Sequence, residues 1–363
     1  MKVLVTGAAG FIGSYISRAL INRGDDVIGI DNFDDYYPRK SKEFNLDLVY
    51  LIAEGSVKYL PENETMPVFE KINSFLQADT RLRSRDIKGK FVFEEGNMID
   101  EGFVRKSFEK NKPDAVIHLA AKAGVPSSLR DPTGYVKTNM VGTANLIEAC
   151  RDLGIKKFVF GSSSTVYGNR EDRKIHEDDD ILHPESPYGA TKVGGEIFCY
   201  TASKVYGIKT TVCRIIGPIY GPLQRQYGMF MQRAINFTFN DREISIYGKK
   251  GLETSKNSTY IDDLVYGLLL CLDYDKNFDV FNIGSGEAQK ISDWIGEIEK
   301  AMGKKVKYTV VEADKGDVGS SVDIAKAQKI LGYNPAMQLS QGVKRQVETF
   351  LLMPDWYKNQ KTV

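Results

Sequence analysis

Short apolar runs alternate with helix-like segments along the first two thirds of the chain. Six runs have strand-like composition, and several are continuously apolar, as expected for strands covered on both faces. Residues 12–24, 103–111, 138–154 and 189–207 show helical patterns, some of which stop at a glycine. This alternation predicts an α/β fold, a doubly wound parallel sheet with right-handed crossovers. The six predicted strands begin at Lys2, Asp26, Lys90, Asp114, Lys157 and Lys209.

Two regions depart from this rhythm. Residues from about 39 to 90 are charged, interrupted by Pro and Gly, and only weakly helical in pattern, so we interpret them as a partly helical insertion, a lid or a contact surface. After residue 215 the pattern loosens, with amphipathic helices predicted at 291–303 and 323–332. We therefore predict a first domain over 1–215, with returns to it from about 255–285. Residues 216–363 would mainly form a smaller α/β domain over the carboxyl edge of the sheet, where ligands of such folds bind.

Composition excludes several classes of partner. The formal net charge is +1, so no global field attracts nucleic acid or an anionic membrane. The longest apolar stretch, near 264–272, is far shorter than the roughly 20 residues of a membrane helix. Four widely spaced cysteines form no zinc or redox motif, and the N-terminus lacks the pattern of a signal peptide. We expect a cytoplasmic protein that binds neither nucleic acid nor membrane and holds no metal.

A glycine-rich segment follows the first predicted strand and opens the first predicted helix. Gly7, Gly10 and Gly13 would permit a tight turn, a close approach of backbone to a pyrophosphate, and close packing of helix on sheet. The free N–H groups at the start of the helix favour phosphate. The spacing is G-x-x-G-x-x-G rather than the commonest G-x-G-x-x-G. For the loop alone, a turn without a ligand is a competing interpretation.

Asp31 supplies the second part of a dinucleotide-binding pattern. It ends the second predicted strand, 31 − 13 = 18 positions after Gly13, close to the expected spacing of about 20. A carboxylate there accepts hydrogen bonds from the adenosine ribose and repels a 2′-phosphate. Because Asn32 rather than an arginine follows, the sequence favours NAD over NADP.

Five motifs occur in order along the chain. They are TGAAGFIG (from Thr6), HLAAKAGV (from His118), SSSTVYG (from Ser162), SPYGATK (from Ser186) and TYIDDLV (from Thr259). Their order and spacing resemble the extended short-chain dehydrogenases/reductases, and among these the NAD-dependent nucleotide-sugar epimerases and dehydratases, the UDP-glucuronate and UDP-glucose 4-epimerases most of all. The resemblance covers nearly the whole chain except 39–90. It implies a Rossmann-like sheet, tightly held NAD, a nucleotide-sugar substrate and, by analogy, a homodimer formed by helices 138–150 and 189–207.

The resemblance assigns the chemistry to Tyr188, Lys192 and Ser163. Tyr188 and Lys192 share a helix face, although four-residue spacing alone is common by chance. In the family, the tyrosine takes the proton of the sugar 4-OH while the C4 hydride passes to NAD⁺, and the hydride later returns to the other face of the sugar. A tyrosine has an ordinary pKa of about 10, so Lys192 and the nicotinamide ring would have to favour its phenolate. Lys192 would also hold the nicotinamide ribose, and Ser163 would hydrogen-bond the reacting hydroxyl.

Further positions are carried over from the family motifs. Asn139 is either a structural anchor or a site residue, and His118 is interpreted as a core histidine. Asp262 and Asp263 are interpreted as an acidic helix start rather than a metal site. The predicted cofactor-binding residues are Gly7, Gly10, Phe11, Ile12, Gly13, Asp31, Asn32, Asn97, Met98, Leu119, Ala120, Ala121, Ser162, Tyr188, Lys192 and Ile215. The predicted substrate-binding residues are Ser163, Ser164, Tyr188, Gly217, Arg225 and Lys256.

The substrate side departs from the family pattern. Lys256 stands where the family commonly has an arginine that grips the nucleotide diphosphate, and a second family arginine is missing from 316–323. Gly217 stands where many relatives carry a polar contact. Arg225, or Lys249 and Lys250, could supply replacement charge.

Three functions remain open. The first is a nucleotide-sugar 4-epimerase, with UDP-glucuronate ahead of UDP-glucose. The second is a dehydratase or decarboxylase on the same scaffold, although Ser164 and Thr165 replace the acidic pair typical of dehydratases. The third is a non-catalytic NAD-binding regulatory protein, which would typically have lost Tyr188 or Lys192.

Overall fold

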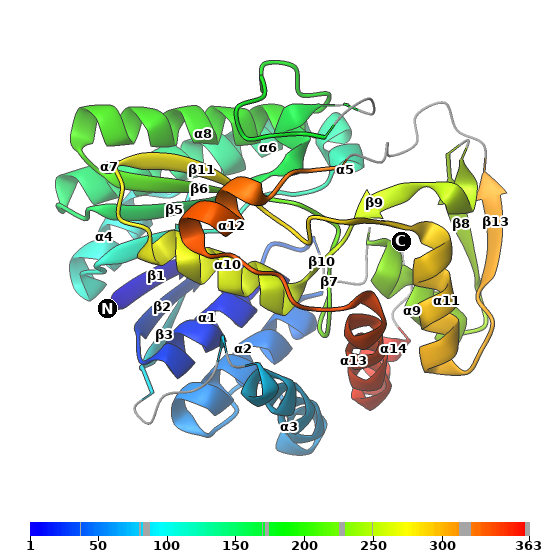
Figure 1. Ribbon diagram of the computed structural model, residues 1–363. Helices are drawn as coiled ribbons and strands as arrows, with labels where there is room; N and C mark the ends of the chain where they lie inside the picture. The colour runs from blue at the N-terminus through cyan, green and yellow to red at the C-terminus, as the bar shows by residue number, and fades with distance from the viewer. Residues whose placement is uncertain are drawn as a thin grey trace.

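The structure is a computed structural model that describes residues 1–36, 38–79, 81–82, 88–168, 170, 174–224, 229–248, 250–311 and 321–359. A seven-stranded parallel sheet lies at its centre, in the order β11-β6-β5-β4-β1-β2-β3 (Figure 1). The predicted doubly wound fold and its six strands are confirmed. The seventh strand, β11, pairs with β6 at the edge of the sheet. The strands are β1 (Lys2–Thr6), β2 (Asp26–Asp31), β3 (Phe91–Glu95), β4 (Ala115–His118), β5 (Lys157–Ser163), β6 (Lys209–Ile215) and β11 (Phe278–Ile283).

Helices cover both faces of the sheet, as parallel strands require. One face packs against α1 (Phe11–Arg23), α2 (Arg39–Glu54) and α10 (Ile261–Asp273). The other packs against α4 (Glu101–Asn111), α7 (Gly142–Asp152) and α8 (Pro187–Tyr206). Alternate residues of one strand feed the two layers: Val3 and Val5 belong to the first hydrophobic cluster and Leu4 to the second. In the described ranges, no helix is both long enough and apolar enough to cross a membrane.

The prediction that residues 39–90 are partly helical is confirmed, and the helices are longer than the weak sequence pattern indicated. Most of the segment forms two full helices, α2 and α3 (Glu62–Ala78). Helix α2 packs on α1 and connects β2 to β3, so it belongs to the doubly wound fold rather than to a lid. The sequence pattern is obscured because α2 buries charged residues. One of them, Asp47, accepts hydrogen bonds from the backbone N–H groups of residues 58–60. In α3 the pattern is interrupted by Pro67 inside the helix.

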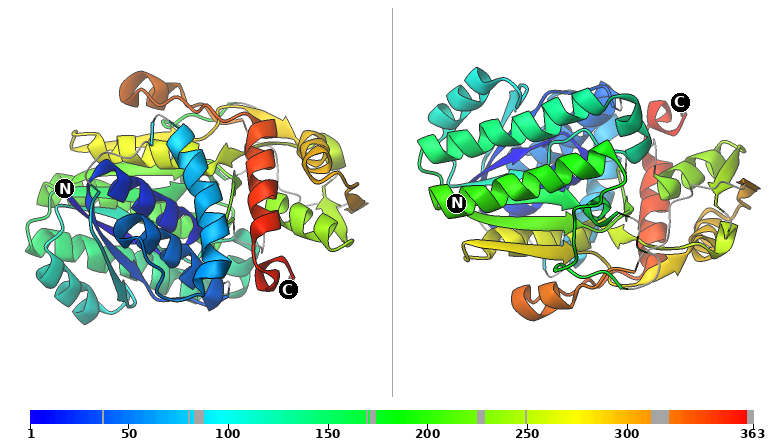
Figure 2. Two further views of the ribbon diagram at one scale, coloured as in Figure 1. Left: turned by 90° about the horizontal axis from the view of Figure 1, so that it is seen from below. Right: turned by 90° about the horizontal axis from the view of Figure 1, so that it is seen from above.

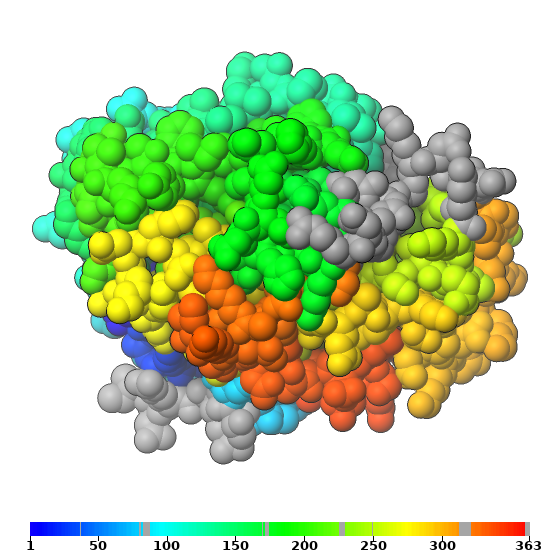
Figure 3. Space-filling view, turned by 45° about the horizontal axis from the view of Figure 1, so that its top comes forward, coloured from blue at the N-terminus to red at the C-terminus, as the bar shows by residue number. Residues whose placement is uncertain are grey.

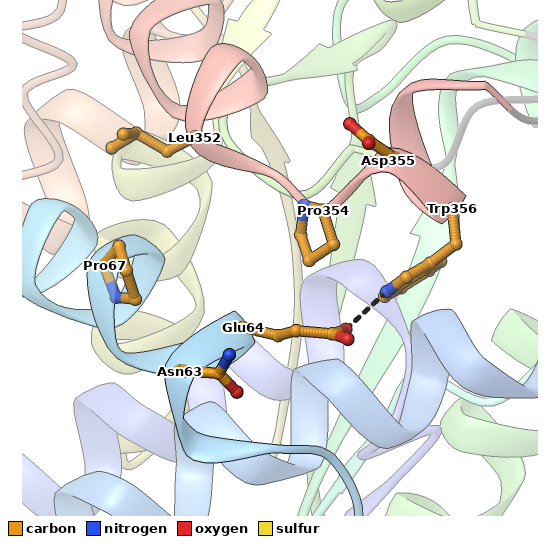
Figure 4. Close-up of a pocket in the computed structure, with 7 residues that line it drawn as sticks. All are labelled: Asn63, Glu64, Pro67, Leu352, Pro354, Asp355 and Trp356. Carbon is orange, nitrogen blue, oxygen red and sulfur yellow. Dashed lines mark hydrogen bonds between the residues drawn. The ribbon is translucent and has the colours of Figure 1, made fainter.

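Helix α3 contacts the last helices of the described chain. It lies beside α13 (Leu339–Leu352), where Lys71 pairs with Glu348 at 2.7 Å (Figure 2). Beyond α13, in α14 (Asp355–Lys358), Trp356 Nε1 donates to the Glu64 carboxylate at 2.9 Å across a shallow pocket (Figure 4). The segment thus joins the first and last parts of the described chain.

The remaining elements lie mostly beside the sheet, to the right in Figure 1. The predicted amphipathic helices are confirmed as α11 (Ile291–Met302) and α12 (Ala325–Leu331). Ile175 and Val322 form a parallel bridge, so residues 174–185 lie against 321–331 on the surface (Figure 3). The division of the chain at residue 215 stays a prediction. The other elements are α5 (Val125–Arg130), α6 (Pro132–Val136), η1 (Lys137–Val141), η2 (Ser164–Tyr167), β7 (Ile219–Tyr220), α9 (Phe230–Phe239), β8 (Glu243–Tyr247), η3 (Gly251–Glu253), β9 (Ser255–Asn257), β10 (Thr259–Tyr260), β12 (Ala288–Lys290) and β13 (Lys307–Val311).

Candidate active site

The carboxyl ends of the parallel strands meet along one edge of the sheet. β1 lies between β2 and β4, so the strand order reverses there and opens the crevice in which such folds bind ligands. The predicted residues gather along this edge, at the strand ends or directly after them. The last residues of the strands concerned are Thr6, Asp31, Glu95, His118, Ser163 and Ile215.

The glycine loop after β1 has no room for side chains. Gly7 adopts a positive φ of 73°, and a Cβ there would lie 3.1 Å from Cα of Ala120. A Cβ on Gly13 would lie 2.0 Å from the carbonyl oxygen of Gly7, so only glycine allows this packing of helix on loop. Gly10 caps α1 without a side-chain hydrogen bond, so Phe11, Ile12 and Gly13 present the positive end of the helix. This cradle fits the pyrophosphate of a dinucleotide.

The segment after β4 forms the floor beside this loop. The hydroxyl of Thr6 accepts hydrogen bonds from the N–H groups of Leu119 and Ala120, each at 3.1 Å, and so fixes the segment that continues through Ala121. Thr6 Oγ1 also lies 2.8 Å from Nδ1 of His118, whose Nε2 lies 2.9 Å from Thr143 Oγ1. Burial lowers the pKa of His118 to about 3. His118 is therefore a neutral, fully partnered core residue, as predicted.

Asp31 ends β2 with its carboxylate buried. Oδ1 accepts from the Phe33 N–H at 2.8 Å and from Lys42 Nζ at 3.0 Å, and Oδ2 accepts from the Ala9 N–H at 3.2 Å. Lys42 and Asp31 form an ion pair whose side chains are 6% and 5% exposed. The neighbouring Asn32 is exposed. The partnership with Lys42, which lies on α2, was missed at the sequence level.

Asn97 and Met98, two of the predicted cofactor-binding residues, lie after β3. Asn97 is exposed, and its Oδ1 accepts from the Ile99 N–H at 3.1 Å. Met98 is buried against Gly142, where an added Cβ would lie 2.7 Å from Met98 Cγ. Both residues therefore have local structural roles, and their contact with a cofactor stays a prediction.

Tyr188 and Lys192 lie on the first turns of α8, one turn apart. Ser186 caps this helix by accepting the Gly189 N–H at 3.0 Å. The rings of Tyr135 and Tyr188 pack edge to face, with their centroids 6.2 Å apart. Lys192 Nζ lies 5.9 Å from the centre of the Tyr188 ring, so the two residues share a helix face as predicted.

Lys192 is a buried cation held by a neutral partner. Its Nζ donates to the Gly161 carbonyl oxygen at 2.7 Å, and the residue is 4% exposed. Burial lowers the pKa of Lys192 to about 8, while the charge of Glu196 acts in the opposite direction. This lysine can therefore exchange its proton near neutral pH.

A buried network behind Lys192 was also missed. Glu196 accepts a 2.5 Å hydrogen bond from Ser162 Oγ and pairs with Arg214 through both of its oxygens. Arg214 in turn donates to Tyr167 Oη at 2.8 Å. The hydroxyl of Ser162 is thus committed to the core beneath α8. The spacing of Tyr188, Lys192 and Glu196, each four residues apart, is the sequence signal that could have indicated this network.

Further polar residues lie near Tyr188 and Lys192. Ser163 is half-buried at the end of β5, beside Ile215 of β6, and its Oγ accepts from Thr165 Oγ1 at 3.1 Å. Ser164 follows as the first residue of η2. The side chain of Asn139 bonds both the N–H and the carbonyl oxygen of Lys122, and Nδ2 also bonds Thr191 Oγ1. These bonds make Asn139 an anchor between a loop and α8.

The other predicted substrate-binding residues are Gly217, Arg225 and Lys256. Lys256 is half-buried on β9, opposite Gln289 of β12. Gly217 is exposed beside a cis bond to Pro218, and Arg225, Lys249 and residues 312–320 lie outside the described residues. Arg233 on α9 was not singled out from the sequence, yet its buried Nε has no hydrogen-bond partner in the described structure.

Asp262 and Asp263 lie in the first turn of α10, as predicted. Asp263 accepts from Arg81 and from two backbone N–H groups, and Asp262 lies 3.7 Å from Arg345. Burial raises the pKa of Asp262 to about 7. These contacts fit a structural acidic helix start.

Comparisons with known proteins agree with this geometry. The model of the NAD dependent epimerase/dehydratase family matches residues 3–284. The chain belongs to this family. It is 33% identical over 346 residues to the UDP-glucuronate 4-epimerase of Thermodesulfobacterium geofontis, covering 95% of this chain and 94% of the relative.

Solved structures of family members superpose over nearly the whole chain. The UDP-glucuronic acid 4-epimerase of Bacillus cereus, solved with UDP-glucuronic acid and NAD, gives a TM-score of 0.77 at 32% identity, covering 96% of this chain and 98% of that one. The UDP-glucose 4-epimerase of Thermotoga maritima, solved with UDP-glucose, gives a TM-score of 0.77 at 31% identity, covering 97% and 99%. The predicted family and its NAD cofactor are confirmed.

Proposed function

We propose that this protein is an NAD-dependent 4-epimerase of a nucleotide sugar, with UDP-glucuronate as the first candidate substrate and UDP-glucose the second. The observation that carries the proposal is the placement of Tyr188 and Lys192 on α8 beside Ser163, at the same sheet edge as the glycine loop. The relatives named above support the choice of sugar.

The residues of this edge divide the reaction between them. Tyr188 takes the proton of the sugar 4-OH and later returns it, and Lys192 one turn away stabilises the phenolate. Ser163, half-buried at the end of β5, holds the reacting hydroxyl. The Gly7–Gly13 loop and Asp31 hold the dinucleotide. NAD, when bound, supplies a reversible acceptor for the C4 hydride.

Loss of water or carbon dioxide is the competing outcome on the same scaffold. Dehydratases of the family need an acid that protonates a leaving hydroxyl, and the residues after Ser163 are Ser164 and Thr165. Neither side chain carries a carboxylate. This absence supports epimerisation over loss of water.

The experiment that tests the proposal is product analysis. The purified protein incubated with UDP-glucuronate should give UDP-galacturonate, an isomer of unchanged mass with an inverted C4 centre in the NMR spectrum. Denaturation should release bound NAD. A product lighter by one water or by carbon dioxide contradicts the epimerase proposal, and so does the absence of turnover with both UDP sugars.

The proposed assembly is a homodimer through η1, α7 and α8. On α8, Ile197, Phe198 and Val205 are 54%, 40% and 66% exposed, and Val141 on η1 is 42% exposed. Apolar side chains gathered on two neighbouring helices support burial against a second copy. Sedimentation should give twice the chain mass, and a monomer would contradict this assembly. The four described cysteines are buried and free, which supports a reducing compartment such as the cytoplasm.

A further inference from the structure

Helix α2 places a cation inside the adenosine end of the cofactor site. Lys42 Nζ lies 3.0 Å from Asp31 Oδ1, and both side chains are almost fully buried. Three residues further along the helix, Asn45 Nδ2 donates to the carbonyl oxygen of Ala9 in the glycine loop at 2.9 Å. The helix is therefore fixed to both parts of the dinucleotide-binding pattern.

The hydrogen bonds of Asp31 leave little capacity for a ribose. A carboxylate has about four acceptor positions, two on each oxygen. Among the described residues, Phe33 and Lys42 fill those on Oδ1, and Ala9 fills one on Oδ2. A single position on Oδ2 therefore remains for a ribose hydroxyl. Moreover, the charge of Lys42 offsets the negative charge that would repel a 2′-phosphate.

We propose that Lys42 is a specificity-determining residue of the cofactor site. Its ammonium group could bind a 2′-phosphate, but Asp31 prevents this by pairing with it. The inference rests on the proposed binding of NAD at this edge. In this family fold the acid at the end of β2 meets the 2′-hydroxyl of the adenosine ribose. A phosphate on that hydroxyl, as in NADP, therefore meets Lys42, the cation that pairs with Asp31. The ion pair as a whole, rather than Asp31 alone, sets the choice between NAD and NADP.

Removing the charge of Asp31 and removing the charge of Lys42 should change the binding of NADP in opposite directions. Without the Asp31 carboxylate, Lys42 loses the buried negative charge that Asp31 supplies, and the phosphate of NADP can replace that charge. Without the Lys42 ammonium, Asp31 keeps its full charge and excludes that phosphate more strongly. If Lys42 were only structural, neither substitution would change the preference in a direction set by charge.

The test measures binding of NAD and NADP by calorimetry to the full-length protein freed of cofactor. Asp31→Asn should bind NADP about 10- to 100-fold more tightly than the unchanged protein does, the effect of one charge-assisted contact. Asp31→Asn combined with Lys42→Met should lose that gain. Lys42→Met alone should raise the ratio of the NADP to the NAD dissociation constant.

Lys40→Met is the matched control, because Lys40 is a half-exposed lysine of the same helix that lies 3.7 Å from Glu64. It should leave the ratio unchanged. If the double variant keeps the NADP affinity of Asp31→Asn, or if Lys42→Met leaves the ratio unchanged, the proposal is overturned. Should Asp31→Asn not fold, Lys42→Met alone decides. If the unchanged protein binds neither dinucleotide, the proposed function itself has failed.

Discussion

The cofactor half and the substrate half of the site differ in how firmly the fold holds their side chains. In the cofactor half, Asp31 and Lys192 are buried at the sheet and held by short hydrogen bonds from neighbouring elements. In the substrate half, Lys256 lies on a three-residue strand and Gly217 presents no side chain. The residues proposed for the redox chemistry thus lie at the sheet and its covering helix, whereas Lys256 and Gly217, proposed to contact the nucleotide, lie on short segments beside it. Such segments can change without loss of the fold.

The largest expected effect tests the firmly held half. Tyr188→Phe keeps the ring that packs against Tyr135 but removes the hydroxyl that is proposed to transfer the proton. Turnover of the sugar should fall about 10²- to 10⁴-fold, the usual contribution of general acid–base catalysis. NAD content and melting temperature should stay unchanged. A wild-type rate in this variant would show that another group moves the proton.

The next effect concerns the buried charge of Lys192. In the cofactor-free fold its pKa lies at about 8, because burial disfavours the charged form, below the ordinary value of about 10.4. Between these values the unfolded chain binds the proton more strongly, so this group makes stability rise with pH; below about 8 its burial penalty is fully present. Lys192→Met lacks this titration.

Urea unfolding of both proteins at several pH values measures the difference. From pH 7.5 to 10.5 the unfolding free energy of the unchanged protein should gain about 3 kcal/mol relative to that of Lys192→Met. A constant difference over this range would show that Lys192 keeps its proton in the fold.

The smallest effect tests the loosely held half. If Lys256 contacts the diphosphate, Lys256→Ala should weaken every diphosphate-linked substrate by about 1.5–3 kcal/mol, roughly 10- to 150-fold. NAD content should not change, and Lys256→Arg should retain binding if the planar fork fits. Arg233→Ala is the comparison variant, because the buried Nε of Arg233 has no hydrogen-bond partner in the described structure. Unchanged affinity in Lys256→Ala would place the diphosphate elsewhere.

Local patterns were sufficient to predict much of this molecule. The apolar strands, the glycines after β1 and the spacing of Tyr188 and Lys192 are written in neighbouring residues, so the sheet and the site edge could be derived from them. The partners of the site charges could not be derived in this way. Lys42 reaches Asp31, and Arg214 reaches Glu196, only through the register of separate elements. Such registers are set by tertiary packing.

Strand β11 lies far along the chain from its neighbour β6, and this separation has a consequence during synthesis of the chain. Strand β6 ends at Ile215, but the strand that covers its outer edge begins only at Phe278. At 5–20 residues per second the ribosome needs on the order of 3–12 s to supply the intervening segment. During that interval the nascent sheet presents the open row of N–H and carbonyl groups along β6, a template for pairing with other chains. The nascent chain therefore exposes the β6 edge to other chains after the segment with Tyr188 and Lys192 has been synthesised and before β11 covers that edge.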